Sequence, residues 1–394
     1  MKTIVLIAPN VSDTMGGEAI KAFQYAKFLI SQGRRVMIIA HSRCRESVES
    51  SFAPENYSII EDEWRQALAW RSVVARPYVG YHFHRAVSER IAELFKPDEV
   101  ILHYIAPVSP VVRRHPPPGY DFVVGPMTGN IYYPPGFRDR MTKNERIRAL
   151  GHEAAQRLTG LVSREKGKAA ALLVSGYERT RESLLMAGAR DSQITDVIDS
   201  GVSGLLMDAP RLTQTGENHR FVTLGRLIPY KGYDLAIRGV AAATPKTELD
   251  IFGEGYLEPE LRALAQDLGV ADRVHFRGRL DNSSIGSEYA NYRAFVFPTL
   301  AEANGIVMQE AMMIGLPVLT FRWGGPAMLA DDDSAEFIEP KSEAQVVREL
   351  AQGMDRLATD PARAESLSIA GRAIAEAKFD WNKVAASWMA TYPE

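Results

Sequence analysis

The stretch AFVFPTLAEANGIVMQEAMMIG, residues 294–315, contains a strand signal followed directly by a helix signal. Its first four residues are apolar and rich in aromatics, which predicts a short buried strand, and residues 305–314 predict a helix that ends at Gly315. A buried strand joined to a helix is typical of a parallel α/β sheet, and the same alternation recurs in both halves of the chain. The sequence therefore predicts doubly wound parallel sheets.

The remaining strand signals are spread along the chain. We expect strands at residues 3–9, 35–41, 99–105, 121–126, 171–175 and 194–199, and near Phe221, Leu249, Val274, Phe295 and Val318. Residues 207–218 are polar and contain proline and glycine, which makes them the best linker candidate.

The turn between the strand expected at residues 294–297 and the helix expected at residues 305–314 has the features of an anion site. Its backbone amides lack partners within the helix and lie at the positive end of the helix dipole, an arrangement that suits a phosphate. These amides belong to Asn304, Gly305, Ile306 and Val307. Glu310 on the helix is suited to two neighbouring ribose hydroxyls, and Glu302 at the rim is suited to hydroxyls of a transferred sugar. The alternative is two solvated glutamates beside an ordinary helix start.

A second loop of this kind lies earlier in the chain. Residues 219–224 predict a strand that ends at Gly225, and residues 234–243 predict a helix, so Arg226 and Lys231 fall on the loop between them. Two cations here can neutralise a departing diphosphate, which lowers the barrier because charge grows on the leaving group in the transition state. The alternative, basic residues on an ordinary loop, leaves two phosphate-type loops within one half unexplained.

With these residues the chain resembles the retaining glycosyltransferases of family four over nearly its whole length. The further motifs, in order, are Gly16-Gly17, His103, Val174-Ser175, residues 197–202, Gly253-Glu254-Gly255, Glu310-Ala311-Met312 and Phe379-Asp380-Trp381. The resemblance implies the GT-B fold, an α/β architecture of two Rossmann-like doubly wound parallel-sheet domains facing a central cleft. The implied domains are an N-terminal acceptor-binding domain at 1–203, a C-terminal nucleotide-sugar-binding domain at 204–375, and a C-terminal helix at 376–394 that crosses back.

The resemblance also implies roles for single residues. The catalytic residues would be His103, close to the donor sugar, with Arg226, Lys231 and Glu302. The donor would be bound by Gly16, Gly17, Arg226, Lys231, Gly253, Arg277, Leu280, Glu302, Asn304, Gly305, Ile306, Val307 and Glu310. Gly17 would face the diphosphate and the sugar, and the backbone near Arg277 and Leu280 would hold the base. No metal site is expected, because the sequence contains no metal-ligand spacing.

The implied function is retaining transfer of a sugar from a UDP- or GDP-sugar to a hydroxyl of a saccharide or lipid-linked acceptor, in polysaccharide, glycolipid or cell-envelope glycan synthesis. No further cofactor is expected. Two alternatives stay open: another GT-B chemistry, either a nucleotide-sugar epimerase or a phosphorylase, and a non-catalytic protein that only binds a nucleotide-sugar. A dehydrogenase is disfavoured, because the loop at Gly16-Gly17 is not Gly-x-Gly-x-x-Gly.

Three features depart from the family pattern. Asn304 replaces the usual aromatic residue between the two glutamates, Ser200 replaces a common asparagine, and Gly324-Gly325 lacks the glutamate that commonly follows. Residues 125–135 form a long loop in the acceptor half, for which we expect a role in specificity, with an ordinary surface loop as the alternative.

Composition sets wider limits. The chain has 394 residues, enough for two domains, and its 46% of hydrophobic residues is ordinary for a soluble globular protein. The single cysteine, Cys44, excludes internal disulfides and favours a cytoplasmic location. The apolar N-terminal run is too short for a signal peptide or a membrane span.

Charge is unevenly distributed along the chain. Residues 1–200 carry 27 Lys and Arg against 22 Asp and Glu, and the remainder carries 19 against 27. The basic half predicts an anionic acceptor or attachment to the inner face of the cytoplasmic membrane, and the slightly acidic whole disfavours nucleic acid. The candidate contacts are Trp64, Trp70, Arg71, Arg76, Tyr78, Tyr81, Phe83, His84 and Arg85, and a basic run of Arg138, Arg140, Lys143, Arg146 and Arg148. The alternative is a core helix with a solvated face.

Overall fold

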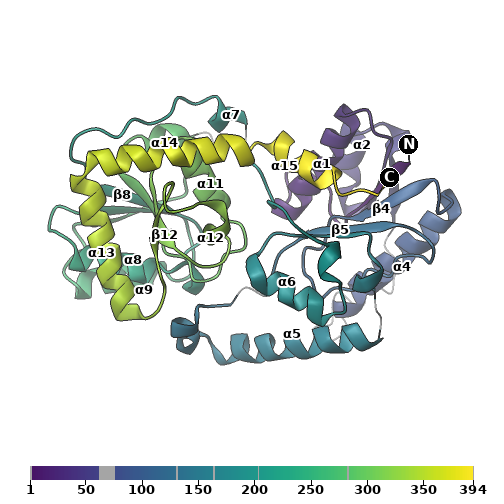
Figure 1. Cartoon of the computed structure of the whole chain (residues 1–394), viewed down its shortest axis with the longest axis horizontal. Helices are drawn as coiled ribbons and strands as arrows, with labels where there is room; N and C mark the ends of the chain where they lie inside the picture. Colours follow the sequence, from purple (N-terminus) through teal and green to yellow (C-terminus); the bar gives the residue numbers. More distant parts are fainter. Residues whose placement is uncertain are drawn as a thin grey trace. The chain divides into compact units, whose positions relative to one another are not determined.

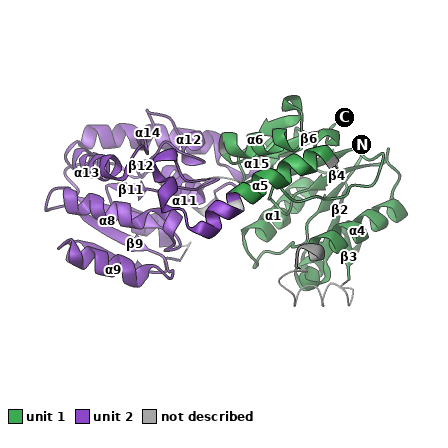
Figure 2. Ribbon diagram, turned by 90° about the horizontal axis from the view of Figure 1, so that it is seen from below, with its two compact units in different colours: residues 1–130, 150–199, 384–394 green, residues 131–149, 200–383 purple. Residues whose placement is uncertain are grey.

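The computed structural model describes residues 2–61, 76–129, 132–162, 165–202, 204–281 and 284–393. The chain forms two compact units (Figure 2). Unit 1 comprises residues 1–130, 150–199 and 384–394, and unit 2 comprises residues 131–149 and 200–383.

Unit 1 is built on a seven-stranded parallel sheet with the order β3-β2-β1-β4-β5-β6-β7. Its strands are β1 (Thr3–Ile7), β2 (Val36–His41), β3 (Tyr57–Ile60), β4 (Val100–Tyr104), β5 (Phe122–Met127), β6 (Ala171–Val174) and β7 (Ile194–Asp196). Its longer helices are α1 (Gly17–Ser31), α2 (Arg45–Ser51), α4 (Arg76–Leu94) and α6 (Tyr177–Met186) (Figure 1). Two helices have residues in both units: α5 (Lys143–Val162) and α15 (Trp381–Met389).

Unit 2 is built on a six-stranded parallel sheet with the order β10-β9-β8-β11-β12-β13. Its strands are β8 (Arg220–Leu224), β9 (Glu248–Phe252), β10 (Val274–Gly278), β11 (Ala294–Phe297), β12 (Val318–Phe321) and β13 (Glu336–Ile338). Its helices are α7 (Gly204–Met207), α8 (Tyr233–Ala242), α9 (Glu258–Asp267), α10 (Ile285–Tyr289), α11 (Ile306–Met313), α12 (Pro326–Leu329), α13 (Glu343–Thr359) and α14 (Pro361–Lys378).

The two sheets follow one topological rule. In each, the first strand lies centrally, the second and third follow on one side, and the later strands follow on the other. The strand order therefore reverses between β1 and β4 in unit 1, and between β8 and β11 in unit 2. In open α/β sheets, ligands bind outside the carboxyl ends of the strands at such a reversal point.

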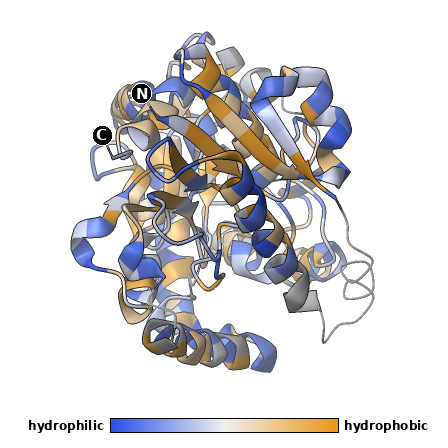
Figure 3. Ribbon diagram, turned by 90° about the vertical axis from the view of Figure 1, so that its right-hand side faces the viewer, coloured by the Kyte–Doolittle hydropathy of each residue, from blue (hydrophilic) through white to orange (hydrophobic). Residues whose placement is uncertain are grey.

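The strands are apolar along most of their length because helices cover both faces of a parallel sheet. β4, β5, β11 and β12 are buried at every position. In Figure 3 the strands have mostly hydrophobic colours, whereas the helices carry hydrophilic colours as well. Among the described residues, no helix combines the length and hydropathy that a membrane span requires.

The predicted fold class, two Rossmann-like doubly wound parallel sheets, is confirmed. Residues 131–149 pack with unit 2. Phe137 and Tyr133 are in the core of unit 2, and a Cβ on Gly136 would lie 1.8 Å from the carbonyl oxygen of Lys341. The division at 203 and 375 stays a prediction.

Candidate functional site

The carboxyl ends of β8, β9 and β10 are packed through glycines. Gly225 and Gly253 have φ of 150° and 126°. A Cβ on Gly253 would lie 1.9 Å from the carbonyl oxygen of Gly225, so only glycine fits there. The Gly253 amide donates to the carbonyl of Gly278 at 2.7 Å. Gly253, which the sequence assigns to donor binding, therefore also has a packing role that sequence reasoning missed.

The two loops singled out in the sequence lie on either side of the β8/β11 reversal point and contact each other. Lys231 ends a short 3-10 helix, Pro229–Lys231, that follows β8. The Tyr230 carbonyl accepts from the Leu300 amide at 2.7 Å, next to β11. Gly232 has φ of 70°, and a Cβ there would lie 2.1 Å from the Pro298 carbonyl oxygen. The two loops, which the sequence predicts from separate motifs, are thus in direct contact.

An ion pair joins the charged residues of the two loops. Lys231 Nζ donates to Glu302 Oε2, and the two side chains are only 15% and 18% exposed. Arg226 is exposed, and its Nη2 donates to the Tyr230 hydroxyl at 3.3 Å. The predicted catalytic residues Arg226, Lys231 and Glu302 are therefore brought together at the end of the sheet.

The N-terminus of α11 has the open amides that the sequence predicts. Gly305 caps the helix with φ of 78°, and its position is tight, since a Cβ would lie 3.0 Å from the ring of Phe297. Within the described residues, no hydrogen bond is made by the backbone amides of Asn304, Gly305, Ile306 and Val307. Four unpaired amides at a helix start form an anion site.

Asn304 has a second, unexpected role. Its side chain is 8% exposed and donates to Ser200 Oγ at 2.7 Å. Its Oδ1 accepts from Gln309 Nε2 at 3.0 Å. Two of the three departures from the family pattern are therefore hydrogen-bonded to each other, a relation that no local signal in the sequence could show.

Glu310 is the most perturbed carboxylate near this site. Burial raises its pKa from 4.5 to about 7. No hydrogen bond to its carboxyl group is present among the described residues. The fully buried Tyr289 hydroxyl lies close enough to interact electrostatically with the Glu310 carboxylate. Among the described residues it also has no hydrogen-bond partner. A half-buried acid without a hydrogen-bond partner in the described part of the chain is costly in a purely structural role and is suited to a ligand with hydroxyl groups.

A third loop, which contains Gly324 and Gly325, packs against the backbone of Glu302 and Ala303. The Gly325 amide donates to the Glu302 carbonyl at 2.7 Å. A Cβ on Gly325 would lie 2.5 Å from the Ala303 carbonyl oxygen, so the Gly324-Gly325 pair allows this close approach.

The side chain of Arg277 is engaged in a cluster around Asp250. Its Nε lies 3.2 Å from Asp250 Oδ2, which also accepts from Tyr292 Oη at 2.6 Å and Arg220 Nη2 at 3.0 Å. Sequence reasoning missed this cluster, although the charged Asp250 within a largely apolar strand pattern could have indicated it. Leu280 is half-buried beyond β10. The expected base contact concerns the backbone at Arg277 and Leu280 and stays a prediction.

In unit 1, His103 is fully buried on β4. Its Nδ1 is 2.7 Å from the Tyr392 hydroxyl and its Nε2 is 2.7 Å from the Gly125 carbonyl, so both nitrogens are occupied. Burial lowers its pKa to about 4, so the ring is neutral at physiological pH. A contact between His103 and a donor sugar requires that one of these partners be displaced, and it stays a prediction. Gly16 and Gly17 are exposed at the start of α1, with open space where a Cβ would lie.

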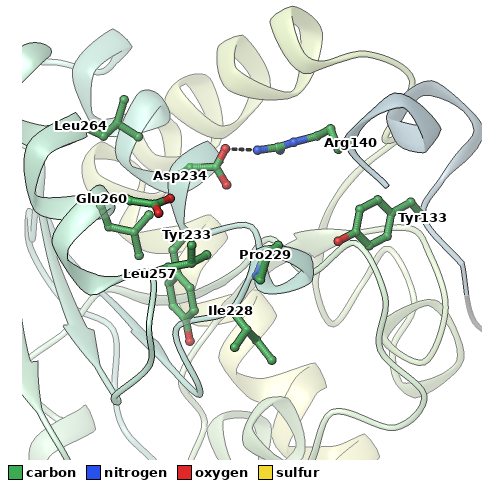
Figure 4. Close-up of a pocket in the computed structure, with 10 residues that line it drawn as sticks. Tyr133, Arg140, Ile228, Pro229, Tyr233, Asp234, Leu257, Glu260 and Leu264 are labelled. Carbon is green, nitrogen blue, oxygen red and sulfur yellow. Dashed lines mark hydrogen bonds and ion pairs between the residues drawn. The ribbon is translucent and has the colours of Figure 1, made fainter. Parts of the chain in front are cut away.

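A cavity of about 410 Å³ lies beside the Pro229–Lys231 turn (Figure 4). Its lining residues come from residues 133–140, the β8–α8 loop, α8, the residue before α9 and α9 itself: Tyr133, Arg140, Ile228, Pro229, Tyr233, Asp234, Leu257, Glu260, Leu261 and Leu264. Arg140 pairs with Asp234 at its edge. The Tyr133 hydroxyl is buried without a partner, and Figure 4 shows it directed toward this space. The end of the predicted specificity loop therefore belongs to unit 2.

The predicted surface contacts in unit 1 have mixed outcomes. Phe83 and His84 are buried, and Phe83 belongs to the core, so neither can contact a membrane. Tyr81 is 43% exposed and Arg85 pairs with Glu89. Trp64, Trp70 and Arg71 lie outside the described residues, as do the side chains of Arg76 and Tyr78. In the described part of the chain, no group of three or more His, Cys, Asp or Glu is placed to hold a metal ion.

Comparison with known proteins relates the part of the chain that carries this site to a family. Residues 194–374 match the family model described as glycosyl transferases group 1. The chain is 32% identical over 178 residues to the GDP-mannose-dependent alpha-(1-6)-phosphatidylinositol monomannoside mannosyltransferase of Mycolicibacterium smegmatis, which covers 42% of this chain and 45% of the relative. It is 28% identical over 247 residues to the D-inositol 3-phosphate glycosyltransferase of Streptomyces bingchenggensis, covering 57% and 53%. The chain thus aligns with about half the length of these curated relatives.

Two solved structures show the same fold over the whole chain. Anabaena Alr3699/HepE in complex with UDP and glucose has a TM-score of 0.65 and 15% identity, and the match covers 99% of both chains. Sucrose-phosphate synthase from Thermosynechococcus elongatus has a TM-score of 0.67 and 19% identity, covering 100% of this chain and 98% of that one. At these identities the likeness concerns the fold. The chain therefore has the GT-B fold, and its residues 194–374 are similar to the group 1 glycosyl transferases.

Proposed function

We propose that the protein is a retaining glycosyltransferase that moves a sugar from a nucleoside-diphosphate sugar to a hydroxyl of a saccharide or lipid-linked acceptor. The observation that carries the proposal is the convergence, at the β8/β11 reversal point, of four unpaired amides with Lys231 and Arg226. This arrangement is suited to the two phosphates of a leaving nucleoside diphosphate.

The roles of the two glutamates follow from their places. Glu310 lies one helical turn into α11, beyond the amides, where its carboxyl group can accept from both hydroxyls of a ribose. Glu302 lies at the rim beside Lys231, where it can accept from hydroxyls of the transferred sugar. Unlike an inverting enzyme, a retaining one would have the acceptor hydroxyl attack from the side of the departing diphosphate, whose oxygen takes the proton.

The leaving group can be neutralised by protein groups alone. Lys231, Arg226 and the amides after Asn304 would stabilise the growing charge, so we propose that the reaction needs no metal ion. Turnover is then expected to survive exhaustive chelation with EDTA, and complete loss of turnover that magnesium restores would contradict this part of the proposal.

The names of two relatives support the proposed substrates. These relatives are named for transfer to phosphatidylinositol monomannoside and to D-inositol 3-phosphate. These names support a glycolipid or an anionic acceptor, and the GDP-mannose of the first relative and the UDP bound to Anabaena Alr3699/HepE support a GDP- or UDP-sugar donor. We further propose that the transfer takes place at the inner face of the cytoplasmic membrane, in envelope glycan synthesis.

The test begins with donor binding. A thermal-shift screen of UDP-, GDP- and ADP-sugars should give one nucleotide class that raises the melting temperature, because a ligand of the native state stabilises it by mass action. The linkage formed with that donor is then determined by NMR, and retention of the donor's anomeric configuration is expected. An inverted linkage would exclude the mechanism, conversion of donor without acceptor would indicate an epimerase, and binding without turnover would indicate a sensor.

A further inference from the structure

Helix α5 carries a row of large apolar side chains that are open to solvent. Ile147, Leu150, Leu158 and Leu161 are 68%, 70%, 61% and 78% exposed. Every other helix that the structure describes exposes at most two such residues. Single exposed apolar residues are ordinary, whereas a continuous exposed row indicates a contact surface.

The four side chains share one face of the helix. At 3.6 residues per turn, they and the exposed Ala154 fall within an arc of about 80°. Gln156 on the opposite side is fully buried and donates to Ser183 Oγ of α6 at 2.7 Å, which holds the helix by its other face. The apolar row is therefore directed away from the unit 1 residues on which α5 packs.

Basic residues border this row. Lys143, Arg146 and Arg157 are exposed and lie on or beside the apolar face by helical periodicity. Two acids accompany them: Glu153 pairs with Arg157 at 2.7 Å, and Asp139 pairs with Arg146 at 3.5 Å, so the set keeps a net positive charge. Two copies of the helix placed face to face would bring two such basic sets together, which disfavours pairing with a second copy. The same charges favour a negatively charged partner.

We propose that α5 docks on an anionic lipid surface, with Ile147, Leu150, Leu158 and Leu161 inserted below the headgroups and Lys143, Arg146 and Arg157 among them. An apolar face bordered by Lys and Arg on a helix of low mean hydropathy is typical of a segment that lies in the membrane interface. The expectation from the sequence rested on net charge, on residues 64–85 and on a basic run that already included Lys143 and Arg146, whereas the exposed apolar row of α5 was not part of it. It does not depend on the sugar chemistry proposed above.

The test is vesicle flotation of the full chain. The vesicles contain equal parts of phosphatidylglycerol and phosphatidylcholine, or phosphatidylcholine alone. The α5 variant combines Leu150→Gln, Leu158→Gln and Leu161→Gln. A matched control combines Leu94→Gln, Leu185→Gln and Ile369→Gln, which are exposed apolar residues of other helices. Glutamine favours helices nearly as well as leucine, so circular dichroism of both variants should match that of the wild type.

The wild type is expected to float with the anionic vesicles, and raising the salt from about 0.05 M to about 0.5 M should weaken its partition at least roughly tenfold. The α5 variant should lose roughly a hundredfold in partition, and the control variant should behave as the wild type. Failure of the wild type to float, or equal flotation of the α5 variant, would overturn the proposal. A wild-type dimer that the α5 variant converts to a monomer, measured by light scattering, would also overturn it and assign the face to a second copy. Transfer to a water-soluble acceptor should be equal in the wild type and the α5 variant, so a failure of the sugar chemistry is seen separately.

Discussion

Replacing Glu310 with glutamine should stabilise the free protein above neutral pH and weaken its binding of a nucleotide. Burial raises the pKa of Glu310 from 4.5 to about 7, and no hydrogen bond to its carboxyl group is present among the described residues. The ionised carboxylate therefore destabilises the folded chain relative to the unfolded chain, and the uncharged glutamine side chain does not.

The size of the stability change follows from the shift in the pKa of Glu310. At about 1.4 kcal/mol per pKa unit, a rise from 4.5 to about 7 lowers the free energy of unfolding by roughly 3 kcal/mol once the group is ionised. Between these two pH values the folded chain binds more protons than the unfolded chain, so the stability of the wild type falls as the pH rises through this window. The glutamine variant lacks this loss, so its advantage should be near zero below pH 4.5 and largest above pH 7.

The measurement is denaturant unfolding at several pH values from 5 to about 8, followed by circular dichroism. Glu254→Gln is the matched control, because Glu254 is an exposed acid of the same unit. A direct measurement of the Glu310 pKa by carbon NMR complements it. Equal stability of wild type and Glu310→Gln at pH 8, or a difference that does not change with pH, would refute the reasoning.

The effect of Glu310→Gln on ligand binding should be opposite to its effect on stability: the variant is more stable but binds the nucleotide more weakly. Loss of a charged acceptor for ribose hydroxyls should weaken nucleoside diphosphate binding at pH 8 by roughly tenfold to a hundredfold. Calorimetry measures this directly. A variant that is more stable and binds equally well would confirm the buried charge and exclude the ribose role.

Five further substitutions test the rest of the site. Arg226→Ala and Lys231→Ala should each lower turnover by roughly a hundredfold or more with the fold intact, and unchanged turnover in both would remove the diphosphate assignment. Gly253→Ala should lower the free energy of unfolding by about 2 to 4 kcal/mol, because its Cβ would meet a backbone oxygen at positive φ, and a loss below about 0.5 kcal/mol by denaturant titration would contradict the close packing. Ser200→Ala and Asn304→Ala should show a coupling of about 1 kcal/mol in a double-mutant cycle, whereas additive losses would mean that their hydrogen bond contributes nothing.

The sequence was sufficient for features that are local. The strand before Arg226 and the helix after Asn304 were predictable, because each has a hydrophobic pattern and a glycine at its boundary. The open amides follow from helix geometry alone. Strands β3 and β13 were not predicted, because both are short edge strands with polar residues and lack a continuous apolar signal.

The features that the sequence could not show depend on distant contacts. Ser200 and Asn304 are 104 residues apart, and only the fold brings their side chains together. The same holds for the cluster of Arg277, Asp250 and Tyr292, whose members lie on different elements. The raised pKa of Glu310 is also a property of the packed site, because it arises from burial and not from a neighbour in sequence.

The ion pair between Lys231 and Glu302 changes how a single substitution should be interpreted. Both side chains are largely buried, so each charge offsets the cost of burying the other in the free protein. Lys231→Ala removes a charge intended for the diphosphate and also leaves Glu302 without its partner, so lost turnover alone does not assign Lys231 to the leaving group. Lys231→Met with Glu302→Gln removes both charges together and restores electrical balance. If the double variant regains the stability that Lys231→Met loses but not the turnover, the charge of the pair acts on the reaction itself and not through the fold.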